Sequence, residues 1–483
     1  MPIPESASVD ADPTTGPIVR QHAVIVLPST GEFDSRTYRI ARTLLERGHR
    51  VTVLARWKPG LLRHETHELG YPIIRVEATA EDGLPLRALT LPLLRLLRLA
   101  ATPVLGRPAR GAGRESVRSG EPEAERGESS LMAAEEGSEE ETEPGWAHPA
   151  ARQPGRLRGY LRRARIFLMI RSHRRRGVAA APPADIYHGM AYMGISVALA
   201  IGRQHRAPVV YDSRDIYMAA ANLARLRGPI KAILARMERG WARAADRVIT
   251  VNRPYAEELA RRLGVEMPVV VMNCSYRTSP PDPPERRFHD RLALAPETRV
   301  VLYQGGFSRD RGIEQLVEAI HLVPDAVLVC MGYGELEPRL RELAADPANA
   351  GKLFVLPAVP PTELLAWVAS ADVVGALFQP TTINHRLSTP NKFLEAMAAG
   401  VPSVVPDDPG MGPIATETGC GIAVKASDVQ AIAAAIQTIV DAPTGERAAW
   451  RRRALAAAHD TYNWETQVQA LLDEYTRLTG RRW

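Results

Sequence analysis

The stretch HAVIVLPSTGEFDSRTYRIARTLLERGHRVTVLA, residues 22–55, decides the fold. It opens with a continuous apolar run (22–28) of the kind that forms a buried strand. A loop then leads into 38–48, where apolar residues recur at helical spacing as far as Gly48. A second apolar strand, 50–55, follows at once. Strand, helix and strand in this order form a βαβ unit, and strands that are apolar throughout predict a parallel sheet covered by helices on both faces.

The same pattern extends along the rest of the chain in two blocks. A proline-rich segment, RTSPPDPPERR (277–287), separates the blocks and is typical of a semi-rigid linker. The sequence therefore predicts an α/β protein with two doubly wound parallel-sheet domains that face a cleft, where ligands bind at the carboxyl ends of the strands. The further strands are expected at 185–189, 208–215 and 245–252 in the first block and at 299–306, 326–334, 353–359, 371–378 and 401–406 in the second.

The composition limits the class of protein. The chain has 483 residues, of which 45% are hydrophobic and 24% charged, as expected for a soluble protein with two or three domains. Aromatic residues make up only 6%, which argues against a surface that stacks nucleic-acid bases. No apolar run approaches the roughly 20 residues that a membrane-spanning helix needs. Three distant cysteines exclude a disulfide framework and give no metal-type spacing, so we expect a cytoplasmic protein without a zinc site.

Two leucine- and arginine-rich stretches, 87–107 and 156–176, flank a segment of different composition. This segment, 107–155, is rich in Gly, Glu, Ser, Pro and Arg and is expected to be a disordered insertion, because it has too little apolar surface to offset the entropy of folding. The two basic stretches predict amphipathic helices that bind an anionic membrane surface at the inner face of the cell membrane. The alternative, that their apolar faces pack on the sheet, stays open. No nucleic-acid recognition module is present, and no nucleic-acid partner is expected.

The segment HRLSTPNKFLEAMAAGVPSVV (385–405) carries the clearest candidate site. Thr389 is a natural N-cap, Pro390 suits the first helical position and Gly400 suits the end, which predicts a helix over 390–399. The start of a helix binds anions, and Lys392 in the first turn is electrostatically unfavourable unless an anion lies nearby.

Asn391 and Glu395 share one face of this helix, and Glu395 lies about 7–8 Å from its start. That offset matches the distance between a diphosphate and a ribose diol. A carboxylate that accepts two hydroxyls suits a ribose. A surface pair of Lys392 and Glu395 on an ordinary amphipathic helix is the alternative.

The segment from Pro390 to Val405 resembles the donor-binding helix of family-4 glycosyltransferases of the group 1 type, which have the GT-B fold of two Rossmann-like domains. The resemblance covers nearly the whole chain except 1–19 and 107–155. It continues through YQGGFSRDRGIEQLVEAI (303–320), MGYGE (331–335), PAVPPTELLAWVASADVV (357–374) and GCGIAV (419–424), and in the first half through FDSRTYRIARTLLERGHRVTVLAR, DIYHGM, VVYDSRDIY and ADRVITVNRPYAEEL.

The resemblance implies the domain organisation. We expect a disordered N-terminus (1–19), an acceptor-side domain (20–282), a nucleotide-sugar-binding domain (283–459) and a C-terminal helix in 460–483 that crosses back to the first domain.

The resemblance also implies roles for individual residues. Glu395 would bind the ribose hydroxyls, Arg311 and Lys392 would neutralise the departing diphosphate, and His188 would contact the sugar hydroxyls. The candidate residues are His188, Arg311 and Lys392 for catalysis; Gly31, Gly305, Gly306, Gly332, Pro390, Asn391 and Glu395 for the donor; and Arg36, Asp212 and Asp215 on the acceptor side.

Several positions depart from the family pattern or allow a second interpretation. The family often has a glutamate eight positions before Glu395, where this chain has Leu387, and an arginine where this chain has Gly306. Backbone amides of 386–390 would then contact the sugar. His188 could instead be a hydrogen-bonded structural histidine, and the two aspartates, 212 and 215, could be turn or helix-cap residues.

The implied function is retaining transfer of a hexose-type sugar from a nucleotide-diphospho-sugar to a glycan or lipid-linked acceptor, without an obligatory metal or other cofactor. Two alternatives are a nucleotide-sugar epimerase of the same fold and a degenerate subunit that binds the nucleotide sugar without turnover. The base, the sugar, the acceptor and the linkage stay open.

Overall fold

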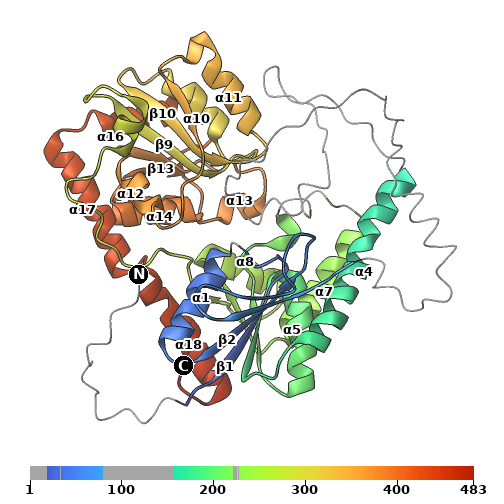
Figure 1. Ribbon diagram of the computed structural model, residues 1–483. Helices are drawn as coiled ribbons and strands as arrows, with labels where there is room; N and C mark the ends of the chain where they lie inside the picture. The colour runs from blue at the N-terminus through green and yellow to red at the C-terminus, as the bar shows by residue number, and fades with distance from the viewer. Residues whose placement is uncertain (1–18, 33, 80–155, 221–222, 224–225, 227) are drawn as a thin grey trace, which may run out of the picture.

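The computed structural model describes residues 19–32, 34–79, 156–220, 223, 226 and 228–483, and it has two α/β domains (Figure 1). The first contains an eight-stranded sheet in the order β3-β4-β2-β1-β5-β6-β7-β8, and the second contains a six-stranded sheet in the order β11-β10-β9-β12-β13-β14. Neighbouring strands are parallel except for β3 and β4. The predicted pair of parallel sheets is confirmed.

In the first domain, helices cover both faces of the sheet, as the apolar strands require. One face packs on α1 and α18, and the other on α5 and α8. The strands are β1 (His22–Val26), β2 (Arg50–Arg56), β3 (His64–Thr66), β4 (Pro72–Val76), β5 (Ile186–Met190), β6 (Val209–Asp212), β7 (Arg247–Thr250) and β8 (Val269–Val270). The helices are α1 (Ser35–Glu46), α4 (Arg156–Ala180), α5 (Ala191–His205), α7 (Pro229–Ala244) and α8 (Arg253–Leu263).

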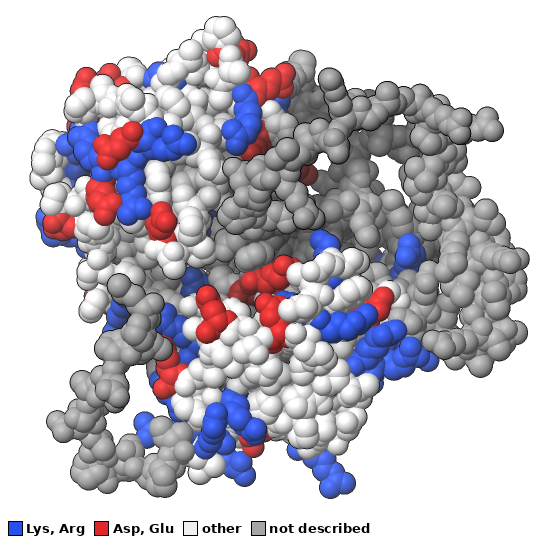
Figure 2. All heavy atoms as spheres, viewed as in Figure 1, with Lys and Arg blue, Asp and Glu red and all other residues white. Residues whose placement is uncertain are grey.

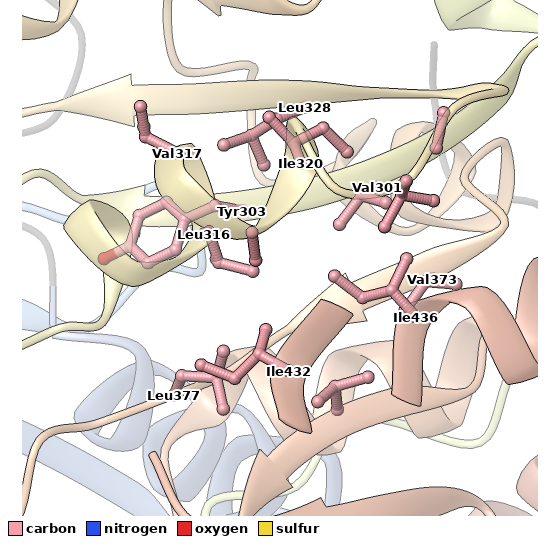
Figure 3. Packing of buried hydrophobic residues seen from close by; sticks show 14 of the residues in the cluster. Val301, Tyr303, Leu316, Val317, Ile320, Leu328, Val373, Leu377, Ile432 and Ile436 are labelled. Carbon is pink, nitrogen blue, oxygen red and sulfur yellow. The ribbon is translucent and has the colours of Figure 1, made fainter. Parts of the chain in front are cut away.

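The second domain repeats this arrangement. Figure 3 shows the core between its sheet and the helices α10 and α16, where Leu316 and Ile320 meet strand residues such as Val301. The strands are β9 (Arg299–Gly306), β10 (Ala326–Tyr333), β11 (Leu353–Leu356), β12 (Val373–Gly375), β13 (Ser403–Pro406) and β14 (Gly421–Val424). The helices are α9 (Arg287–Leu292), α10 (Ile313–Ile320), α11 (Glu337–Ala345), α12 (Leu364–Ala369), α13 (Ile383–Leu387), α14 (Asn391–Ala399), α15 (Gly412–Thr418) and α16 (Val429–Val440).

The C-terminal segment connects the two domains. Helix α17 (Thr444–Asp460) packs against α14 in the second domain, and α18 (Trp464–Thr479), red in Figure 1, lies against the first sheet. The indole Nε1 of Trp464 donates to Thr43 Oγ1 at 2.8 Å, and the buried Trp483 packs in the same core.

Two predicted helix starts were wrong. Helix α1 begins three residues earlier than expected, because the Asp34 side chain accepts from the Thr37 amide and caps it there. Helix α14 begins at Asn391 with Pro390 as its N-cap residue. Thr389 is not the cap, because its hydroxyl donates to Gly410 O at 2.6 Å and accepts from Asn252.

The predicted insertion (107–155), the basic stretch 87–107 and residues 1–18 lie outside the described residues. Of the stretch 156–176, the part from Arg165 onward packs against α5 and α7 through apolar side chains such as Ile170. Its exposed arginines are 165, 171, 174 and 175. Within the described ranges, no helix is both long enough and apolar enough to cross a lipid bilayer.

Candidate functional site

The carboxyl end of β9 presents open backbone to the solvent. Gly305 and Gly306 are both exposed, and Gly305 has a φ of +112°, which favours glycine. A Cβ on Gly306 would meet nothing within 4 Å, whereas one on Gly332 in the neighbouring β10 would overlap the carbonyl oxygen of Gly305. A close approach of the two strands therefore requires glycine at 332. The result is an exposed stretch of glycine backbone beside the start of α14.

Glu395 lies one turn into α14, where Gln304 of β9 holds it. Gln304 Nε2 donates to Glu395 Oε2 at 2.7 Å, and the Gln304 side chain is buried. Burial raises the pKa of Glu395, while the hydrogen bond from Gln304 opposes that shift. Among the described residues, none donates a hydrogen bond to the second carboxylate oxygen, Oε1, and the residue is partly exposed, so this oxygen is available to a ligand hydroxyl. Gln304 was not predicted as a site residue, because it interrupts an otherwise apolar strand without any motif of its own.

Two basic side chains converge behind the exposed glycines. Lys392 is buried, and its Nζ lies 3.5 Å from the centre of the Tyr303 ring and about as close to Gly305, where an added Cβ would be 3.9 Å from it. Arg311 places its guanidinium 4.3 Å from the centre of the Phe378 ring, and its Nε donates to Ser308 Oγ at 3.2 Å. The Tyr303 ring thus holds Lys392, and the Phe378 ring and the Ser308 hydroxyl hold Arg311, near the end of β9.

The first domain contributes an arginine to the same region. Arg39 of α1 lies near the Glu395 carboxylate, and burial lowers the pKa of Arg39 while the charge of Glu395 raises it. Arg39 Nη1 donates to Asn273 Oδ1 at 2.8 Å, and Asn273 Nδ2 donates to Asn391 Oδ1 at 3.2 Å. The exposed Asn391 is thus linked to the first domain. Arg39 and Asn273 were also missed, because only the tertiary structure brings them to α14.

Gly31 lies in the loop between β1 and α1, at the carboxyl end of a central strand of the first sheet. It has a φ of +78°, and an added Cβ would lie 3.3 Å from Ala55 Cβ. Both the backbone angle and the crowding favour glycine there.

Three of the predicted site residues form a buried network instead of a cleft surface. Arg36 Nε donates to Asp212 Oδ2 at 2.6 Å, and His188 Nε2 lies 3.1 Å from the same oxygen. His188 Nδ1 lies 2.7 Å from the hydroxyl of Tyr475 on α18. All of these side chains are buried. In this structure none of these side chains is open to a substrate, and the roles predicted for His188 in catalysis and for Arg36 and Asp212 on the acceptor side stay predictions.

Burial alone would raise the pKa of Asp212, but the Arg36 guanidinium and the His188 hydrogen bond outweigh it and hold that pKa below its ordinary value. The network joins α1, β5, β6 and α18, and Arg36 Nη1 also donates to Val271 O at 2.7 Å.

Asp215 lies where the two domains meet. Asn384 of α13 donates through Nδ2 to Asp215 Oδ1 at 3.1 Å and accepts through Oδ1 from the Ile216 amide at 2.9 Å and the Tyr255 hydroxyl at 2.8 Å. Asn252 Nδ2 donates to Leu387 O at 2.6 Å.

The apolar residues of α13 complete this contact. Leu387, which stands where the family often has a glutamate, packs with Ile383 on the core of the first domain. Helix α13 thus fastens the second domain to the first directly before the start of α14.

In the part of the chain that the structure describes, no group of three or more His, Cys, Asp or Glu side chains is arranged to hold a metal ion.

Comparisons with known proteins agree with this architecture. The family model described as "Glycosyl transferases group 1" matches residues 284–456, and that described as "Glycosyl transferase 4-like domain" matches residues 118–274. The structure is similar to sucrose-phosphate synthase from Thermosynechococcus elongatus (TM-score 0.61, 17% identity, 95% of this chain and 100% of that one). It is also similar to HepE of Anabaena in complex with UDP (TM-score 0.59, 16% identity, 95% and 100%).

These neighbours place the fold in the GT-B class of glycosyltransferases. The two family models together match more than half of the chain, which belongs to the group 1 glycosyltransferases.

Curated relatives lie within the same family. The chain is 28% identical over 252 residues to D-inositol 3-phosphate glycosyltransferase of Xylanimonas cellulosilytica, which covers 50% of this chain and 58% of the relative. It is 30% identical over 213 residues to GDP-mannose-dependent alpha-(1-6)-phosphatidylinositol monomannoside mannosyltransferase of Mycolicibacterium smegmatis, covering 42% and 53%. The chain thus spans a little over half the length of these two relatives.

Proposed function

We propose that this protein is a retaining glycosyltransferase that moves a hexose-type sugar from a nucleotide-diphospho-sugar to a glycan or lipid-linked acceptor. One observation carries the proposal: exposed glycine backbone, two cations and a carboxylate held by Gln304 converge at the end of β9 and the start of α14. The exposed glycine backbone and the two cations suit a diphosphate, and the carboxylate suits the hydroxyls of a ribose. HepE, which shares the fold, has been solved with UDP-glucose.

In this proposal the main chemical task is to stabilise the charge that develops on the departing diphosphate. The peptide groups of Gly305 and Gly306 and the start of α14 supply hydrogen-bond donors and a favourable dipole. Arg311, which lies beside Phe378 and Ser308, and the buried Lys392 supply positive charge. Because protein groups provide this stabilisation, the proposed reaction needs no obligatory metal or other cofactor.

We further propose that the first domain receives the acceptor at a membrane surface on the cytoplasmic side. Figure 2 shows basic side chains gathered on the lower right of the described surface, the side on which Figure 1 places α4 and α7. The exposed arginines 165, 171, 174 and 175 of α4 support this proposal, because each arginine near an anionic surface contributes about 1 kcal/mol to binding.

Sedimentation with vesicles tests the proposed membrane contact. Binding should rise with anionic-lipid content and fall with added salt, and binding that ignores lipid charge would contradict the proposal.

The donor is tested by thermal denaturation with UDP-, GDP- and ADP-sugars in turn. A ligand that binds the folded state raises the melting temperature by mass action, so the true donor class should raise it most.

Product analysis then separates a transferase from an epimerase and from a degenerate subunit. A transferase consumes the donor only with an acceptor, an epimerase converts it alone, and a degenerate subunit binds it without turnover. No shift with any of the three sugar nucleotides would contradict the proposal.

Glu395→Ala tests the ribose contact. Loss of charge-assisted hydrogen bonds typically costs about 1.5–3 kcal/mol, so the donor dissociation constant should rise about 10- to 150-fold. Isothermal titration of the folded variant measures this. Glu318→Ala, a change of an exposed glutamate on α10, is the matched control and should bind as the wild type does. Unchanged donor affinity in Glu395→Ala would overturn the assignment.

A further inference from the structure

Lys392 is an unusual lysine within the site. Its side chain is only 9% exposed, and its Nζ is buried without a hydrogen-bond acceptor in the described structure. The groups that face it come from five places: the ring of Tyr303 on β9, the ring of Phe378 after β12, the guanidinium of Arg311 after β9, the thiol of Cys330 on β10 and the carboxylate of Glu395 on its own helix. The Glu395 carboxylate is already hydrogen-bonded to Gln304.

These surroundings disfavour an ammonium group while the site is empty. Removing an unpaired ammonium from water is unfavourable, and the nearby positive charge of Arg311 adds to that cost. The face of the Tyr303 ring at 3.5 Å offsets only part of it. Burial first, and Arg311 next, accordingly lower the pKa of Lys392 well below its ordinary value, although Glu395 opposes them.

We propose that Lys392 is a neutral amine in the empty site and takes up a proton when a nucleoside diphosphate binds. The proton comes from solvent and forms the third N–H bond of the ammonium, and it returns to solvent when the diphosphate leaves. The negative charge of the diphosphate supplies the counter-charge that the empty site lacks. This inference rests on the proposed function, because it requires a diphosphate beside Gly305.

The sign of the pH dependence follows directly. Binding that takes up a proton weakens as the pH rises, by up to about tenfold in dissociation constant per pH unit for one proton. A lysine that was charged throughout would give no such slope.

The test is calorimetric titration of the full chain with UDP, GDP and ADP in turn at about pH 8, where the diphosphate is itself fully ionised. Each titration is run in HEPES and in Tris, because the difference in their heats of ionisation reports the protons exchanged. We expect close to one proton taken up per diphosphate bound. Lys392→Arg should bind with almost no uptake, because a guanidinium stays charged throughout. Lys425→Met, a change of an exposed lysine in the same domain, should keep the uptake.

The outcomes separate the two proposals. Binding of a diphosphate without proton uptake by the wild type, or full uptake by Lys392→Arg, would overturn the role of Lys392 and leave the proposed function standing. No binding by any of the three diphosphates would overturn both. The wild-type titration alone decides whether a proton is taken up, so the inference does not depend on the folding of a variant.

Discussion

Asp212→Ala is expected to destabilise the first domain by about 3–5 kcal/mol, since removing one partner of a buried ion pair leaves the other charge uncompensated. In this chain both Arg36 and His188 would lose their acceptor inside the core. Urea denaturation followed by circular dichroism measures the loss. The matched control is Asp473→Ala, an exposed aspartate on α18, which should change the free energy of unfolding by less than about 0.5 kcal/mol.

The same variant gives a pH test. The pKa of Asp212 is lower in the folded state, because Arg36 and His188 outweigh the effect of burial, so its contribution is full above the unfolded pKa of about 3.9 and declines as the pH falls below it. The difference in unfolding free energy between wild type and variant should therefore shrink by about 1.4 kcal/mol per pH unit below about pH 3.9. An equal difference at pH 7 and pH 3 would contradict the ionised state of Asp212.

Arg311→Ala is expected to lower kcat by about 10²–10³, the range seen when one group that stabilises developing negative charge is removed. The reason is that the positive charge of Arg311 matters most as the diphosphate departs, and interactions specific to the transition state act on kcat. Initial rates over a range of donor concentrations measure both constants.

The neighbouring Arg309 supplies the control. It follows the same strand, and its backbone amide, which the substitution keeps, donates to Glu335 Oε1 at 3.3 Å, so Arg309→Ala should keep nearly the wild-type kcat. An effect of Arg311→Ala on KM alone would count against its role with the leaving group.

The parts of the fold that depend on local pattern were predictable. The apolar runs 22–28 and 299–306 were predicted as buried strands, and they contain the parallel strands β1 and β9. Gly400 was predicted to end α14, and it does so in the left-handed conformation, with a φ of +74°. Such features depend only on neighbouring residues and on the propensities of single residue types.

What the sequence could not show was the direction in which polar residues near strand ends point. His188 and Asp212 were expected in the cleft, but they pair with groups far away in sequence: Tyr475 is 287 positions from His188. Gln304 contacts Glu395 across 91 positions. Such pairings follow from tertiary packing, and no local pattern marks them. Thr389 failed as a cap for the same reason, because Asn252 and Gly410 bind its hydroxyl.

The crossing of α18 has a consequence for the order of events during synthesis. Trp464, Tyr475 and Trp483 belong to the core of the first domain, yet the whole second domain precedes them in the chain. A ribosome adds about 5–20 residues per second, so the part of that sheet face that α18 covers, beside α1, stays exposed for about ten seconds or more while the second domain is made. Exposed faces of this kind are prone to aggregation, and domains that complete themselves early avoid the problem. A chaperone that shields nascent chains should therefore raise the yield of this protein in particular.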